Sequence, residues 1–131
     1  MFVDMKRGAV EMNPEREYDL IITVVNRGYA DVVVEAAKKA GAQGGTIFYA
    51  RGTGIHEVEK FFGITIQPEK EVVLNLVKHK LTRQIMHAIV DEAGLSTPGR
   101  GLSFALPVED VVGVLHHVDV DEFLKQYRNS E

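Results

Sequence analysis

Apolar positions along the chain follow two periods, one typical of strands and one typical of helices. The chain contains four segments that predict strands. Two are apolar runs, at 18–25 and 101–107, and two are apolar on both faces, at 45–51 and 69–79. Segments 29–40 and 82–93 repeat apolar residues every three or four positions, which predicts helices that end at Gly41 and Gly94. We expect Thr82 to cap the second helix and 119–129 to form a short C-terminal helix.

The predicted order is β-α-β-β-α-β, which indicates an α+β fold. Two split βαβ halves with both helices on one face make a ferredoxin-like sandwich. The long connection 52–68 joins the second and third strands, and a loop of this length is usually functional or mobile. The sheet face without helices is apolar, so we expect a homo-oligomer. Residues 1–17 are interpreted as a polar N-terminal leader and 18–131 as a single domain.

Composition narrows the possible functions. The chain of 131 residues is long enough to bury a core, and its net charge of −4 gives no electrostatic reason to expect a nucleic acid partner. The lack of cysteine excludes disulfides, thiolate metal ligands and a cysteine nucleophile, and is compatible with a cytoplasmic protein. No apolar run has the length of a membrane span, and the N-terminus lacks a signal-peptide core.

Two glycine-rich turns carry the candidate chemistry. Gly52-Thr53-Gly54 follows the strand that contains Thr46, and Gly99-Arg100-Gly101 begins the last strand. Such turns expose backbone N–H groups that can cradle phosphates, and the arginine adds donors that match phosphate geometry. Each turn alone could equally be a plain surface turn, and Thr46 an ordinary strand residue. We expect the fold to bring the two turns together at the functional site.

Together these features resemble the PII signalling family, the trimeric nitrogen-regulatory proteins, over about 18–114. The strand that ends in Gly52-x-Gly54 at the root of a long loop resembles the base of the family's T-loop. The segment 99–104, followed by Leu106-Pro107-Val108, resembles the B-loop and the strand after it. The third point of resemblance is the element order with its oversized loop.

The resemblance implies a cytoplasmic homotrimer that binds an adenine nucleotide in clefts between subunits. The T-loop of one subunit and the B-loop of its neighbour line each cleft. Nucleotide, often with a small-molecule effector, then sets the loop that regulates a membrane transporter or an enzyme. The implied nucleotide-binding residues are Thr46, Gly52, Thr53, Gly54, Ile55, Gly99, Arg100, Gly101, Leu102 and Ser103. The implied partner or effector loop comprises His56, Glu57, Glu59, Lys60, Phe61, Phe62 and Lys70.

The sequence departs from the family pattern at several positions. Leu102 stands where the family commonly has a phosphate-directed lysine, and Gly113 and Leu115 take the places of further arginines. Arg100 is therefore the clear phosphate contact, and ATP, ADP, AMP, a cyclic nucleotide or another small ligand stays open. His56 lies near the position of a glutamine that helps bind magnesium and 2-oxoglutarate, so both are open here. The loop contains no tyrosine, and uridylylation at its tip is not expected.

Two other functional classes stay open. The first is a ferredoxin-like trimer that binds a divalent metal or another small ligand, as in the divalent-cation tolerance proteins. It would use His56 with Glu57 and Glu59, or His116-His117, although adjacent histidines point opposite ways on a strand. The second is a small enzyme on the same fold. No nucleophile elbow or HExxH motif is present, so we expect neither a metal site nor catalysis.

Overall fold

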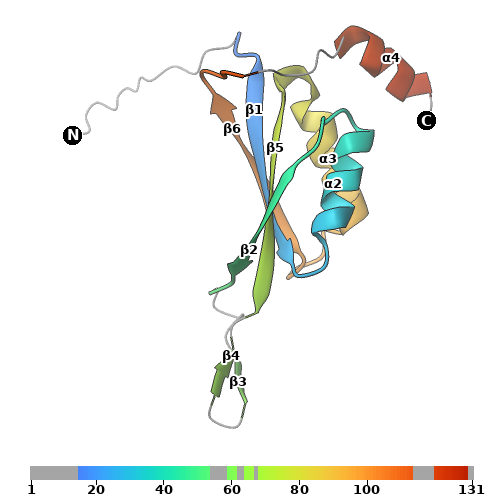
Figure 1. Ribbon diagram of the computed structural model, residues 1–131. Helices are drawn as coiled ribbons and strands as arrows, with labels where there is room; N and C mark the ends of the chain where they lie inside the picture. The colour runs from blue at the N-terminus through green and yellow to red at the C-terminus, as the bar shows by residue number, and fades with distance from the viewer. Residues whose placement is uncertain (1–14, 54–58, 62–63, 67, 114–119, 130–131) are drawn as a thin grey trace, which may run out of the picture.

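The order of helices and strands agrees with the sequence prediction. A computed structural model of the chain describes residues 15–53, 59–61, 64–66, 68–113 and 120–129 (Figure 1). Its elements are β1 (Tyr18–Asn26), α2 (Ala30–Lys39), β2 (Thr46–Arg51), β3 (Glu59–Phe61), β4 (Ile64–Ile66), β5 (Glu69–Lys78), a 3₁₀ turn (His79–Leu81), α3 (Thr82–Ala93), β6 (Gly101–Val108) and α4 (Val120–Asn129). The β-α-β-β-α-β order and the C-terminal helix are confirmed. The long connection additionally contains the hairpin β3–β4, which was not expected.

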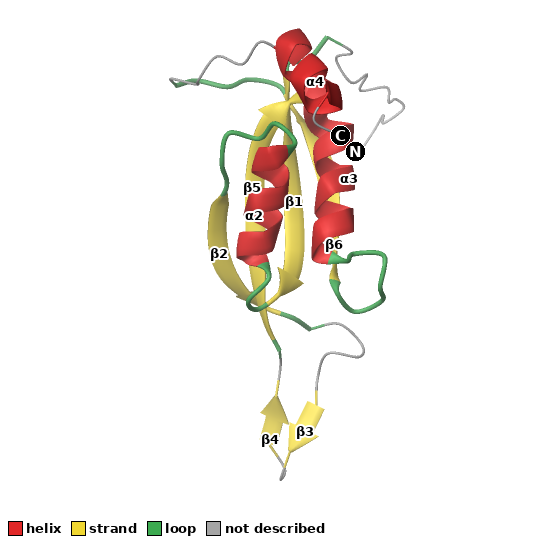
Figure 2. Ribbon diagram, turned by 90° about the vertical axis from the view of Figure 1, so that its right-hand side faces the viewer, coloured by secondary structure: helices red, strands yellow, loops and turns green. Residues whose placement is uncertain are grey.

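The main sheet has the strand order β2-β5-β1-β6, and every neighbouring pair is antiparallel. Helices α2 and α3 lie side by side on one face of this sheet (Figure 2). Along β1, alternate residues beginning with Asp19 are buried under the helices, whereas the residues between them are half-buried. The predicted α+β, ferredoxin-like sandwich is therefore confirmed.

The hydrophobic core fills the space between the helices and the sheet. Its largest fully buried apolar side chains come from β1, β5, α2, α3 and the 3₁₀ turn, namely Ile21, Val25, Val73, Val33, Ile85, Ile89 and Leu81. Helices α2 and α3 pack against each other, and the small residues Ala37 of α2 and Ala40, just after it, are buried in the core. The C-terminal helix α4 adds Leu124 and Tyr127 to the edge of this core. Among the described residues, no helix is both long and apolar enough to cross a lipid bilayer.

The sheet face opposite the helices is apolar and open. Phe48, Leu102, Phe104 and Leu106 are exposed by 45%, 56%, 40% and 47%. The last three stand directly opposite apolar residues of β1, so that they form a continuous apolar surface on β1 and β6. An exposed surface of this kind is typical of an interface between chains.

The predicted cap of the second long helix is wrong. Thr82 is the first residue of α3, the N-cap position is Leu81, and no side chain caps the helix there. The 3₁₀ turn leads directly into α3, and the Thr82 hydroxyl instead donates to Asp19 Oδ2 at 2.7 Å. The C-terminal prediction is confirmed, because Gly94 ends α3 in the left-handed conformation with φ of 70°.

Candidate functional site

The root of the β2–β5 loop closes where β2 and β5 pair. Arg51 stands opposite Glu69 in the register, and the Gly52 amide donates to the Pro68 carbonyl at 2.9 Å. Thr46 begins β2, five residues before its end, which is about 16 Å away at the usual strand rise. The structure therefore places Thr46 on the same strand as the loop root but not beside it.

Three residues of the predicted effector loop, His56, Glu57 and Phe62, lie outside the described residues. The predicted nucleotide-binding residues Gly54 and Ile55 lie outside them as well. Glu59, Lys60 and Phe61 form β3, which pairs with β4. Within the described parts of the chain, no group of three or more histidine, aspartate and glutamate side chains could hold a metal ion.

The α3–β6 turn, residues 94–101, is held by its own backbone. The Thr97 amide donates to the Gly94 carbonyl at 3.1 Å, and the Arg100 amide donates to the Thr97 carbonyl at 3.2 Å. Gly99 and Gly101 have φ values of +84° and +142°, which favour glycine. A Cβ on Gly101 would also lie 2.3 Å from the Val24 carbonyl oxygen, so no side chain fits there.

The side chain of Arg100 lies across Tyr29, at the start of α2. Its Nη1 donates to the Tyr29 hydroxyl at 3.2 Å, and its guanidinium carbon lies 5.4 Å from the centre of the tyrosine ring. This contact orients the guanidinium and occupies one of its five N–H donors. The side chain of Arg100, which was predicted to contact phosphate, is therefore held at the turn by Tyr29. Its remaining N–H donors can bind an anion.

The two residues after Gly101 point to opposite faces of the sheet. Leu102 belongs to the open apolar face. The Ser103 hydroxyl lies on the helix side, 2.9 Å from the Thr23 hydroxyl. Since Thr23 is completely buried, this hydrogen bond ties β6 to β1 beneath the helices. The hydroxyl of Ser103, which was predicted to bind nucleotide, thus has a hydrogen-bond partner within the chain.

Asn26, which was not predicted as a site residue, connects the α3–β6 turn to the start of β5. Its Nδ2 donates to the Gly99 carbonyl at 3.0 Å, and its Oδ1 accepts from Lys70 Nζ at 2.7 Å. Lys70 follows the loop root and was predicted as a loop residue. The next residue, Arg27, forms an ion pair with Glu69. The only feature of the sequence that could have pointed to Asn26 was a polar residue directly after an apolar run.

The two glycine-rich turns lie at the same end of the sheet but at opposite edges of it. The register places Asn26 opposite Lys70, Val25 opposite Gly101 and Arg51 opposite Glu69, so both turns lie at the end of the sheet where β1 ends. The strands that carry them, β2 and β6, are the two outer strands. The prediction that the fold joins the two turns is therefore wrong for a single chain, which brings only the α3–β6 turn and the start of β5 together through Asn26.

Comparison with known proteins agrees with this architecture. The family model for nitrogen regulatory protein P-II matches residues 18–117. Among solved structures, the crystal structure of PII from Arabidopsis thaliana bound to citrate has the same fold. Its TM-score is 0.60 and its sequence identity is 24%, over 79% of this chain and 88% of that one. The family match covers most of the chain and includes both glycine-rich turns, and we conclude that this protein belongs to the nitrogen regulatory protein P-II family.

Proposed function

We propose that this chain is a regulatory protein that binds an adenine nucleotide between the subunits of a homotrimer. One observation carries the proposal. The β2–β5 loop root and the α3–β6 turn lie at the same end of the sheet, on its two outer strands. A second subunit placed edge to edge with the first would bring the α3–β6 turn of one chain to the loop root of the other.

The open apolar face supports such an assembly. Leu102, Phe104 and Leu106 leave a large part of their surface in water in the single chain. Burial of apolar surface gains free energy at about 25 cal/mol per Å², so covering this face favours association. Three copies around an axis would bury it and close three equivalent clefts.

The α3–β6 turn supports an anionic ligand. Arg100 keeps unused guanidinium donors after its bond to Tyr29, and nothing lies within 4 Å of a Cβ on Gly99, so the backbone of the turn has open space beside it. Citrate in the Arabidopsis protein is also an anion. We assign Gly99, Arg100 and Gly101 to the phosphates, with Gly52 and Thr53 of the neighbouring subunit opposite them.

The β2–β5 loop is the proposed surface for a regulated transporter or enzyme. The hairpin β3–β4 lies beyond the end of the main sheet (Figure 1). The contacts of Lys70 with Asn26 and of Asn26 with Gly99 run from the exit of this loop to the nucleotide-binding turn. Ligand at the turn can bias the loop root through this path.

Calorimetric titration of the full chain with ATP, ADP, AMP and cyclic AMP, each with and without magnesium, tests the proposal. We expect micromolar binding of one of them, and an affinity about tenfold lower in Arg100→Ala, because a charge-assisted hydrogen bond is lost. Arg128→Ala, a change at an exposed arginine of α4, is the control and should bind normally. Absence of binding by all four nucleotides would contradict the proposal, and unchanged affinity in Arg100→Ala would remove its main phosphate contact.

A further inference from the structure

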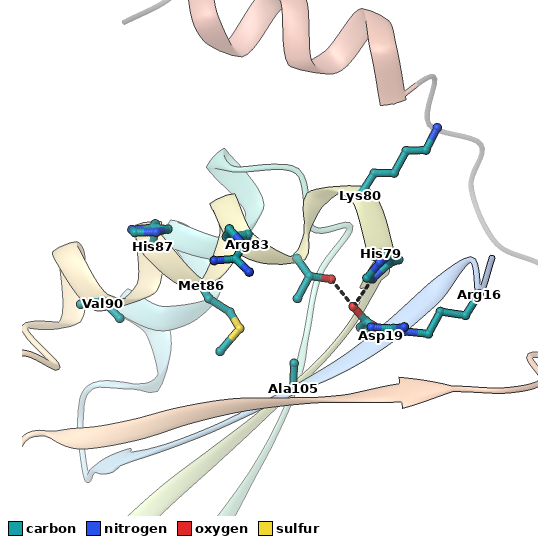
Figure 3. Close-up of a pocket in the computed structure, with 10 residues that line it drawn as sticks. Arg16, Asp19, His79, Lys80, Arg83, Met86, His87, Val90 and Ala105 are labelled. Carbon is teal, nitrogen blue, oxygen red and sulfur yellow. Dashed lines mark hydrogen bonds and ion pairs between the residues drawn. The ribbon is translucent and has the colours of Figure 1, made fainter. Parts of the chain in front are cut away.

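A second candidate site lies far from the two glycine-rich turns. It is an open groove of about 870 Å³ between the start of α3 and β6 (Figure 3). We call it the α3 groove and define it by Arg16, His79, Arg83, Met86, Val90 and Ala105. Asp19, at its inner end, precedes Asn26 by seven residues of β1, which is roughly 23 Å along the strand. Its volume is in the range of small-molecule sites.

The polar end of the groove is positively charged. Asp19 is the only acidic residue among the described residues that line it, and it is 2% exposed. Arg16 Nε lies 2.7 Å from Asp19 Oδ1, and His79 Nδ1 and the Thr82 hydroxyl each lie 2.7 Å from Oδ2. Asp19 carries one negative charge against the three positive charges of Arg16, Lys80 and Arg83, so the groove keeps a net positive charge.

Lys80 lies at the polar end of the groove, whereas Arg83 lies beside its apolar part (Figure 3). The side chain of Arg83 is exposed, and within the described part of the chain it has no hydrogen-bond or ion-pair partner. Figure 3 shows Arg83 and Met86 pointing from α3 toward β6, where Ala105 forms the opposite wall. The two side chains are three residues apart and share one face of the helix. A guanidinium thus lies directly beside an apolar surface.

We propose that the α3 groove binds a small organic anion with an apolar body. The anionic group would contact the guanidinium of Arg83, which offers a planar set of donors suited to carboxylate. The apolar body would lie along Met86, Val90 and Ala105, where its contact with water is reduced. This site is separate from the proposed nucleotide site and does not depend on it.

The four methionines of the chain provide a direct probe. They are Met1, Met5, Met12 and Met86, and Met86, the one within the described residues, lines the α3 groove. The full chain is labelled with ¹³C in the methionine methyl groups, and Met86→Leu assigns the groove signal. Titration with octanoate, a carboxylate on an unbranched alkyl chain, should shift the Met86 signal in a saturable way. Arg83→Gln should weaken octanoate binding about tenfold, the loss expected for one charge-assisted hydrogen bond.

Two controls separate the anionic and the apolar contributions. Arg128→Gln removes an exposed arginine of α4 and should leave the octanoate affinity unchanged. Neutral 1-octanol should bind about tenfold more weakly than octanoate, because it lacks the charge that Arg83 recognises. The urea midpoint of Arg83→Gln, expected to be that of the parent protein, shows that the variant is folded.

Three results would overturn the proposal. One is a Met86 signal that does not move with octanoate. The second is equal octanoate affinity in folded Arg83→Gln and in the parent protein. The third is binding of 1-octanol as tight as that of octanoate, which would show an apolar surface without anion recognition. Nucleotide binding is measured separately through Arg100→Ala, so failure of one proposal leaves the other standing.

Discussion

Gly99 and Gly101 of the α3–β6 turn both have positive φ, but only Gly101 faces a crowded backbone. A Cβ on Gly101 would lie 2.3 Å from the Val24 carbonyl oxygen, whereas nothing lies within 4 Å of a Cβ on Gly99. We predict that Gly101→Ala lowers the free energy of unfolding by about 3 kcal/mol and Gly99→Ala by about 1 kcal/mol, since only the former adds a clash to the backbone strain. Urea unfolding measures both. Equal losses would show that the backbone near Val24 moves freely aside.

The Asp19 carboxylate makes stability depend on pH. Burial opposes its ionisation, but the hydrogen bonds from His79, Arg16 and Thr82 outweigh burial and lower the pKa of Asp19 below its ordinary value of 3.8. Because the pKa is lower in the folded state, the ionised form stabilises the fold at higher pH. This contribution is lost as the pH falls below 3.8 and through the folded value.

We therefore predict that Asp19→Asn costs about 2 kcal/mol at pH 7, because three donors lose a charged acceptor, and progressively less in acid. Urea unfolding over a series of pH values from neutral to acidic measures this difference. Glu35→Gln is the control, since its ion pair with Lys38 at 3.7 Å is exposed and should matter by less than about 0.5 kcal/mol. A cost for Asp19→Asn that is the same at every pH would contradict the assigned role of its charge.

The sequence pointed to Arg100 as a candidate site residue but missed Asn26 and Asp19 for a physical reason. Arg100 was predicted because it lies in a glycine-rich turn that resembles the B-loop of the family. Two partners of the Asn26 side chain are 44 and 73 residues away, and two of the partners of Asp19, His79 and Thr82, are 60 and 63 residues away. Only the strand register brings those partners together, and that register cannot be read from a single segment.

Among the elements, the N-terminus of helix α2 is capped by a side chain from strand β5. Glu71 of β5 is 8% exposed, and its Oε1 accepts from the Gly28 and Ala30 amides at 3.0 and 2.9 Å. A carboxylate at a helix N-terminus satisfies free amides and is favoured by the helix dipole. The cap therefore comes from β5 rather than from the helix's own first residue.

We predict that Glu71→Gln destabilises the protein by about 1 kcal/mol and raises amide hydrogen exchange at Ala30, because the charge at the helix N-terminus is lost. Glu69→Gln is the matched control. Its side chain is 62% exposed and pairs with Arg27, so the change should cost at most about 0.5 kcal/mol. Thermal unfolding and exchange mass spectrometry measure the two effects. An unchanged exchange rate at Ala30 would argue against the cap.

Most elements could be predicted from local pattern, and the exceptions depend on tertiary contacts. The apolar run of β1 and the glycine stop of α3 are strong local signals, and both were confirmed. The hairpin β3–β4 was missed because its strands have only three residues each. The role of Thr82 was misjudged because Asp19, 63 residues away, competes for its hydroxyl.

At the scale of the whole molecule, the open sheet face determines the assembly that we propose. Phe104 lies within that face and is 40% exposed in the single chain. We predict that the parent protein has a solution mass about three times the 14.6 kDa of the chain, and that Phe104→Glu is a monomer, because the interface would have to bury an unpaired charge. Light scattering after size-exclusion chromatography measures both masses.

Val112→Glu is the control for this prediction. Val112 is 98% exposed outside the sheet, and its replacement should leave the mass unchanged. A monomeric parent protein, or a Phe104→Glu variant that still assembles, would show that the open face is not the interface. Assembly through this face would then not bring together the two turns that lie on the outer strands.

In the assembly that we propose, the two glycine-rich turns of adjacent subunits form one nucleotide site. Hydrogen exchange of the full chain, with and without the nucleotide that binds best in calorimetry, tests this most directly. We predict slower exchange in both 46–53 and 94–103, and loss of this protection in the Phe104→Glu monomer. Protection of neither turn by bound nucleotide, or protection of both turns that persists in the monomer, would contradict the claim.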